Sequence, residues 1–276
     1  LGLVVVFGFS SAPKIFKSLI ESFGWREAWM IIAMIVSIGF VIFAIIFYRD
    51  NPQKYGLIPD GKVLKPRRKN APVYQPKHDY TLKEARKTYS FWVFNLSLAL
   101  FALYFTAMTF QVESIFESAG LSEEIAISIF IPAALIAVGV QAFVGWISDF
   151  VRLKYILLFQ LLGLLLSSLG IMILHEGIPV LMIIIGNGIA QGVFGVVSAI
   201  TWPRFFGISH LGAISGFHLS WNVAGSALGP YFFSLSLKFT ETYYAGALLC
   251  FGIAAVLFVM ALKADNVNEV KVYQET

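Results

Sequence analysis

Long runs without a formal charge restrict this 276-residue chain to a membrane environment. Each run holds about 20 residues or more, which as a helix crosses the roughly 30 Å hydrocarbon core of a bilayer. Hydrophobic residues make up 58% of the chain and charged residues only 13%, which excludes an ordinary soluble domain. The charge-free runs are 28–48, 88–112, 125–148, 155–175, 177–203, 205–237 and 242–262.

One basic segment, residues 48–88, interrupts these apolar runs. It carries 11 of the chain's 20 Lys and Arg residues against four acidic residues. If this segment, the tail and the loops at 149–154 and 202–211 lie on the cytoplasmic side of the membrane, that side carries 16 of the 20 bases. We therefore predict a multi-pass protein of the cell membrane whose linker and C-terminus are cytoplasmic. A nucleic-acid partner is not expected, because the positive charge is concentrated in the linker.

The order of the runs predicts an all-α polytopic membrane protein with eight spans, two before the linker and six after it. The apolar run at 1–11 begins abruptly without an initiator Met, so we expect a fragment of a longer protein. The pattern Gly-x4-Pro occurs at Gly8 and again at Gly225, 217 residues later. This offset favours a parallel duplication of a six-helix unit, as in many transporters, although Gly and Pro also recur by chance in membrane helices. The predicted divisions are 1–47 (truncated N-terminal half), 48–88 (linker), 89–264 (C-terminal half) and 265–276 (tail).

Four short stretches are distinctive in their order along the chain: Phe23-Gly24-Trp25-Arg26, the linker start at 51–61 (NPQKYGLIPDG), Gly145-Trp146-Ile147-Ser148-Asp149, and Trp202-Pro203-Arg204-Phe205-Phe206-Gly207. Together they resemble the major facilitator superfamily from its fifth helix to its C-terminus. The linker start is similar to prokaryotic members related to monocarboxylate and oxalate/formate carriers. The resemblance implies a helix bundle that moves a small solute by alternating access.

The loop after the eighth predicted span departs from the family's pattern. The family has a basic residue directly after the Asp and a Gly three positions on, where this chain has Phe150 and Arg152. We nevertheless expect a gating or structural loop here, with Asp149 and the following bases forming a charge lock or anchoring the loop in the headgroup region. The residues of this predicted loop are Gly145, Asp149, Arg152 and Lys154.

Polar residues within the spans are candidates for a solute-binding cavity, because polar groups are costly in the membrane and tend to face a bundle interior. Asn187 and Gln191 lie four residues apart, as do His218 and Asn222, so each pair forms a polar stripe on one helix face. Tyr104 and Gln111 add polar groups on the seventh span. Interhelical hydrogen bonding is the alternative role for all of them.

Lys14 and Lys17 are the bases within the first predicted span. Lys14 is a candidate handle for an anionic solute, whereas Lys17 is close enough to the helix end to reach the interface. In oxalate/formate-type relatives a basic residue lies in helix eleven near the position of Asn222, and its absence here argues against the same substrate.

The sequence predicts a transporter and not an enzyme. The four His residues show no ligand spacing, and we expect no metal and no cofactor. The expected partners are the lipid bilayer, a small solute such as an organic anion of the monocarboxylate class, and a coupling proton or counter-solute. A non-transporting membrane sensor or scaffold is the alternative, followed by a membrane-embedded enzyme. Pro132 and the pattern Gly225-x3-Gly229-Pro230 predict a kink in the eighth span and a break in the eleventh.

Overall fold

The computed structural model describes residues 2–47, 73–76, 78–265 and 269–272 and is almost entirely helical, which confirms the predicted fold class. The chain divides into two compact units. One comprises residues 8–71, and the other comprises residues 1–7 and 72–276. Two short strands, β1 (Val73–Pro76) and β2 (Glu269–Val272), were not predicted. They pair in antiparallel fashion, with Val73 opposite Val272, and so join the end of the linker to the tail.

The helix α1 (Gly2–Phe47) consists of two helices that meet at Gly24. Gly24 has φ 79° and ψ 160°, a conformation that glycine adopts at little cost. The rings of Phe16 and Trp29 lie on opposite sides of the turn with their centroids 5.7 Å apart. The structure thus has a turn within the stretch Phe23-Gly24-Trp25-Arg26.

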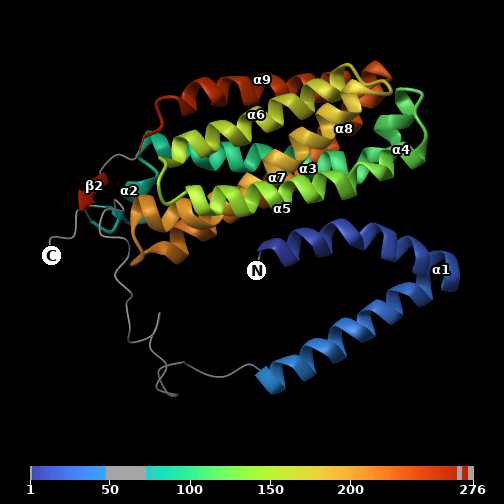
Figure 1. The fold of residues 1–276 in the computed structure, drawn as a ribbon, viewed down its shortest axis with the longest axis horizontal. Helices are drawn as coiled ribbons and strands as arrows, with labels where there is room; N and C mark the ends of the chain where they lie inside the picture. The colour runs from blue at the N-terminus through green and yellow to red at the C-terminus, as the bar shows by residue number, and fades with distance from the viewer. Residues whose placement is uncertain (1, 48–72, 77, 266–268, 273–276) are drawn as a thin grey trace. The chain divides into compact units, whose positions relative to one another are not determined.

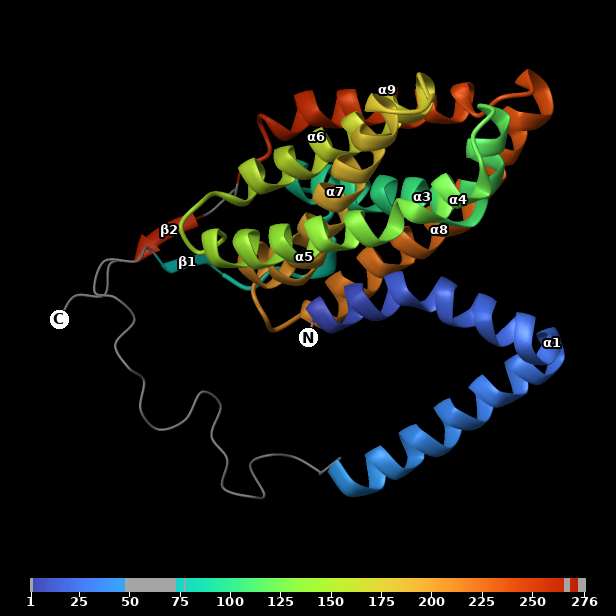
Figure 2. The same ribbon diagram turned by 45° about the vertical axis from the view of Figure 1, so that its right-hand side comes forward.

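The remaining helices form an elongated bundle in which they run side by side (Figures 1 and 2). Helix α3 packs on α8 and α9, and α7 packs on α5 and α6. We call the end that carries α2 the linker end, and the end that carries α4 the far end (Figure 1). The helices are α2 (Leu82–Ala85), α3 (Tyr89–Ser118), α4 (Glu123–Ser128), α5 (Phe130–Ile147), α6 (Leu153–Met172), α7 (Ile178–Phe206), α8 (Leu211–Thr240) and α9 (Tyr244–Ala261).

Pro132 explains why the eighth predicted span is divided into α4 and α5. Proline has no amide hydrogen for the carbonyl four residues earlier, which belongs to Ser128, and its ring clashes with that carbonyl. Helix α4 ends at Ser128 and α5 begins at Phe130. The predicted kink is therefore present, whereas the break predicted near Pro230 is not, because α8 continues as a helix to Thr240.

Six helical segments among the described residues are long and apolar enough to cross a membrane. The eight expected spans exceed this number for two reasons. The two helices of α1 are counted as one segment, Ile15–Phe47. Helix α8 has 30 residues but is not among the six, and it carries polar residues such as His218 and Asn222.

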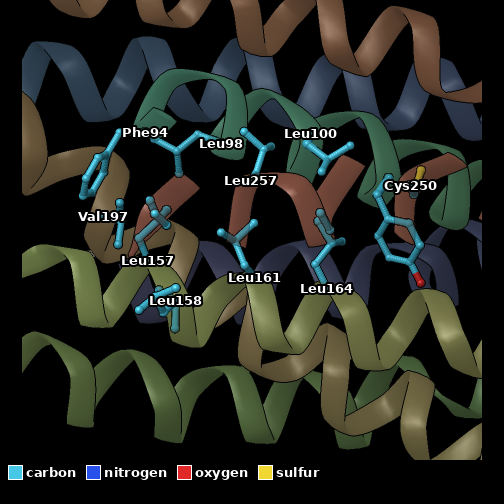
Figure 3. Packing of buried hydrophobic residues seen from close by; sticks show 14 of the residues in the cluster. Phe94, Leu98, Leu100, Leu157, Leu158, Leu161, Leu164, Val197, Cys250 and Leu257 are labelled. Carbon is cyan, nitrogen blue, oxygen red and sulfur yellow. The ribbon is translucent and has the colours of Figure 1, made fainter. Parts of the chain in front are cut away.

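Part of the core of the bundle is a layer of mainly aliphatic side chains between α6 and its neighbours (Figure 3). Leu157, Leu161 and Leu164 of α6 are fully buried and point toward α3 and α9, where Leu98 and Leu257 meet them (Figure 3). On its other side α6 touches α7 backbone to backbone. A Cβ atom added at Gly186 of α7 would lie 2.5 Å from the carbonyl oxygen of Gly163, so only glycine fits at this crossing.

Candidate functional site

A buried polar cluster joins α3 and α8 in the bundle, with His218 at its centre. Nδ1 of His218 lies 3.1 Å from Oδ1 of Asn95, and Nε2 lies 2.9 Å from Nδ2 of Asn222. His218 and Asn222 are one helical turn apart on α8, as the sequence spacing predicts. Asn95 approaches from α3. We call His218, Asn95 and Asn222 the histidine cluster.

The histidine cluster is closed to the surroundings within this unit. His218 is 5% exposed, Asn222 9% and Asn95 0%. The indole of Trp202 from α7 covers the imidazole, with the ring centroids 4.6 Å apart and the planes tilted by 37°. The cluster therefore lies where three helices of the bundle meet.

Three buried polar atoms around His218 have no hydrogen-bond partner among the described residues. They are Nδ2 of Asn95, Oδ1 of Asn222 and Nε1 of Trp202. A buried polar group without a partner costs about 1–3 kcal/mol. Residues that touch one imidazole thus carry two unpaired donors and one unpaired acceptor, which a polar group or a water molecule would satisfy.

The hydrogen-bond partners assign the tautomer of His218. Asn95 Oδ1 is an acceptor, so it requires a hydrogen on Nδ1, and Nε2 is then free to accept from the Asn222 amide. This is the neutral imidazole. A second proton would reside on Nε2, where the unpaired Oδ1 of Asn222 would accept it after rotation of the amide.

A second chain of hydrogen bonds involves Tyr104 and Asn187. The hydroxyl of Tyr104 is 2.6 Å from Oγ of Ser167, and that Oγ donates to Oδ1 of Asn187 at 3.0 Å. These residues come from α3, α6 and α7, and all three are buried. Tyr104 and Asn187 thus bind each other through Ser167, which is the interhelical role considered for them from the sequence. Gln191, one turn further along α7, is half-buried.

Gln111 is bonded across the α3–α8 contact near the far end. Its Nε2 donates to the carbonyl oxygen of Pro230 at 3.0 Å and to Oγ of Ser234 at 2.7 Å. The irregularity in this region lies in α3 and not at Pro230, because Gln111 itself has φ −121° and ψ 17°. The side chain of Lys14 lies outside the described residues, so its predicted role stays a prediction.

The predicted charge lock forms with a different acid from the one expected. Nη1 of Arg152 and Nζ of Lys154 each lie 2.8 Å from Oδ2 of Asp265, beyond the end of α9. Asp149 is exposed and is bonded to neither base. Asp149 is close to these bases in sequence, whereas the packing of α6 on α9 brings Asp265 to them, and the role of Asp149 in this loop stays a prediction. Gly145 is exposed on α5.

Arg204 stabilises the same loop from α7. Its Nη1 donates to the carbonyl oxygen of Ser148 at 2.7 Å, and Nη2 donates to that of Val151 at 3.4 Å. A cation at the C-terminal carbonyls of a helix is favoured by the helix dipole. The loop after α5 is therefore held from both α7 and Asp265.

The end of the linker docks on the loop between α7 and α8, a contact that the sequence did not reveal. The Asp79 carboxylate accepts hydrogen bonds from Oγ of Ser209 and, at 3.1 Å, from the amide of Ile208. These bonds, with that of Ser209 the stronger cause, lower the pKa of Asp79 below its ordinary value. The amide of Tyr80 also donates to the carbonyl oxygen of Phe206 at 2.8 Å. Gly207, at φ 82°, lies against Asp79, where a side chain would collide with the carboxylate.

Within the described residues, no group of three or more His, Cys, Asp or Glu side chains is arranged to hold a metal ion.

Long apolar helices that exchange buried hydrogen bonds define a polytopic α-helical membrane protein. A comparison with protein families matches residues 1–230 to the Major Facilitator Superfamily. The chain belongs to this superfamily, which makes it a secondary transporter of small solutes. A comparison with curated proteins finds no match.

Proposed function

We propose that the protein transports a small organic anion, such as a monocarboxylate, by rocking of two halves around a central site. The observation that carries this proposal is the histidine cluster with its three unpaired polar atoms. Two of them are N–H donors, from Asn95 and Trp202, which suit the oxygen atoms of a carboxylate. The linker start, which is similar to that of monocarboxylate and oxalate/formate carriers, supports the same substrate class.

His218 is the proposed coupling group. The neutral imidazole binds both asparagines, and a second proton changes which atom of Asn222 faces it. Protonation would thus rearrange the donors and acceptors offered to the solute. Tyr104, Asn187, Gln191 and Gln111 are proposed to line the same pathway in other conformations of the transport cycle.

The linker end is proposed to face the cytoplasm. Lys83, Arg86 and Lys87, which are described at the end of the linker, belong to this end together with Arg152, Lys154 and Arg204, and this agrees with the positive-inside rule. The far end carries Glu113, Glu117, Glu123 and Glu124 and would face the opposite side.

Uptake of radiolabelled lactate, formate and oxalate into proteoliposomes tests the transport function. We expect saturable uptake of at least one of these anions. Asn95→Ala removes an N–H donor to the carboxylate and should raise the KM by about tenfold or more, since a hydrogen bond to a charged group contributes about 1.5–3 kcal/mol. Asn222→Ala removes the partner that orients the His218 imidazole and should also raise the KM. Ser220→Ala is the matched control, because Ser220 lies on the exposed face of the same helix and bonds only its own helix, at Gly216.

His218→Gln separates coupling from binding. Glutamine keeps a donor and an acceptor but cannot carry the proton, so we expect exchange of solute to continue while a pH gradient no longer drives accumulation. Unchanged kinetics in both asparagine variants would refute the site, and no flux of any tested solute would favour a sensor or scaffold.

A further inference from the structure

A basic hollow lies at the linker end, beside the first turn of α3. It is lined by Leu82, Lys83, Arg86, Lys87 and Trp92 and has a volume of about 560 Å³. The three bases are exposed, and among the described residues no acidic side chain lines the hollow.

The local structure fixes this basic hollow. The guanidinium of Arg86 lies 4.9 Å from the ring centroid of Phe217, and the carbonyl oxygen of Arg86 accepts a 2.7 Å hydrogen bond from the indole of Trp92. Glu84 is the acid in this short helix. Its carboxylate accepts hydrogen bonds from the amide and the hydroxyl of Thr81, each at 2.8 Å, and these bonds lower its pKa.

An apolar groove between α3 and α9 begins one helical turn below the hollow. Leu96 of α3 lines this groove, and Trp92, four residues earlier on the same face, lines the hollow. The α9 wall runs from Met260 to Ala245, which is about 22 Å of helix. Gly252 lies on this wall, and nothing within 4 Å would meet a Cβ atom there, so the groove of about 670 Å³ is open along its middle.

We infer that the hollow and the groove together bind one anionic phospholipid. The headgroup phosphate lies between Lys83, Arg86 and Lys87, and one acyl chain extends along Leu96 and the α9 wall. The geometry favours this occupant because the cationic surface and the apolar surface succeed each other along the bilayer normal. The headgroup and the acyl chain of a phospholipid have the same order. A tryptophan at the boundary is typical of the membrane interface.

A generic attraction of the basic linker for anionic membranes is the competing explanation, since each base near an anionic surface attracts it. The two explanations differ in which bases matter. The hollow needs Lys83, Arg86 and Lys87, whereas a generic attraction needs only net charge. The groove adds a second difference, because a generic attraction is indifferent to its shape.

Native mass spectrometry of the detergent-solubilised protein with equimolar POPG and POPC tests the inference. The unaltered protein should retain POPG over POPC as a single preferred adduct. The triple variant K83Q/R86Q/K87Q should lower POPG retention about tenfold or more. The charge-matched control K65Q/R67Q/K69Q changes two lysines and one arginine in the linker outside the described residues, and it should retain POPG.

Gly252→Leu tests the groove, because Gly252 lines it and an added Cβ atom there meets nothing within 4 Å, so the leucine side chain would occupy space that the acyl chain needs. Its matched control is Gly139→Leu on α5, where a Cβ atom also meets nothing within 4 Å. We expect the first to reduce POPG retention and the second to leave it unchanged. Circular dichroism and elution volume check that each variant is folded.

Three outcomes would overturn the inference. The linker control losing as much POPG as the hollow variant would indicate generic charge attraction. Full retention of POPG by Gly252→Leu would show that no acyl chain occupies the groove. Displacement of POPG by millimolar inorganic phosphate would identify an anion site without a lipid chain.

Discussion

Replacing Gly186 by alanine should destabilise the bundle by roughly 1–3 kcal/mol, the usual cost of inserting a methyl group into a packed interior. The added Cβ atom would lie 2.5 Å from the carbonyl oxygen of Gly163 and 2.6 Å from the amide nitrogen of Ser167. Ordinary contacts begin at 3.4 Å, so α6 and α7 would have to separate by about 1 Å. Neither contacting atom belongs to a flexible side chain, and the strain therefore cannot be relieved by a change of rotamer.

The matched control is Gly139→Ala, which carries the same chemical change in the interior of α5. Nothing lies within 4 Å of its added Cβ atom, so the substitution should stabilise the helix by about 0.5–1 kcal/mol through the lower backbone entropy of alanine. The two variants are thus expected to move the midpoint of thermal unfolding in opposite directions, measured in the same detergent. A Gly186→Ala midpoint equal to or above that of Gly139→Ala would refute the packing argument.

Three further predictions concern polar contacts. Asp265→Asn should lower the unfolding free energy by about 1 kcal/mol, because two partly exposed ion pairs are lost, while Asp149→Asn should leave it unchanged; chemical denaturation compares the two. Because the pKa of Asp79 is lowered, the contact between Asp79 and the α7–α8 loop is fully formed above pH 3.8, the ordinary pKa of aspartate, and should weaken as the pH falls below that value. Faster hydrogen exchange at the end of the linker would show this weakening. Asp79→Asn should remove the pH dependence. Ser167→Ala should cost about 1–3 kcal/mol by leaving the Tyr104 hydroxyl unpaired, and adding Tyr104→Phe should recover much of this loss in the same denaturation assay.

The sequence predicted the helices well because their length and apolarity are local properties. Charge-free runs mark the apolar part of each long helix, Gly24 allows the turn in α1, and Pro132 divides the eighth span. The stripe of His218 and Asn222 was also predictable, since four residues return a helix to the same face.

The partners of these residues were not predictable, because they depend on which helices become neighbours. Asn95 lies 123 residues from His218, and Asp265 lies 113 residues from Arg152. The sequence offered several buried amides and several acids, without a rule for choosing among them. The docking of Asp79 on the α7–α8 loop was not predictable for the same reason. Gly207, which directly follows Phe205 and Phe206, indicates only that some group comes close to the backbone there.

The contacts within the C-terminal bundle indicate how the proposed rocking motion would be distributed. Helices α6 and α7 touch through backbone atoms at Gly163 and Gly186, so sliding between them has a steep steric cost. At the linker end, Asp265, beyond the end of α9, and Arg204 of α7 bind the loop after α5. These contacts favour movement of this bundle as one body. The histidine cluster would then be exposed in two ways, by motion of the bundle against a partner half and by local rotation of α8. A cysteine pair that crosslinks α6 to α7 should then leave transport intact, whereas fixing α8 to α3 beside His218 should abolish it.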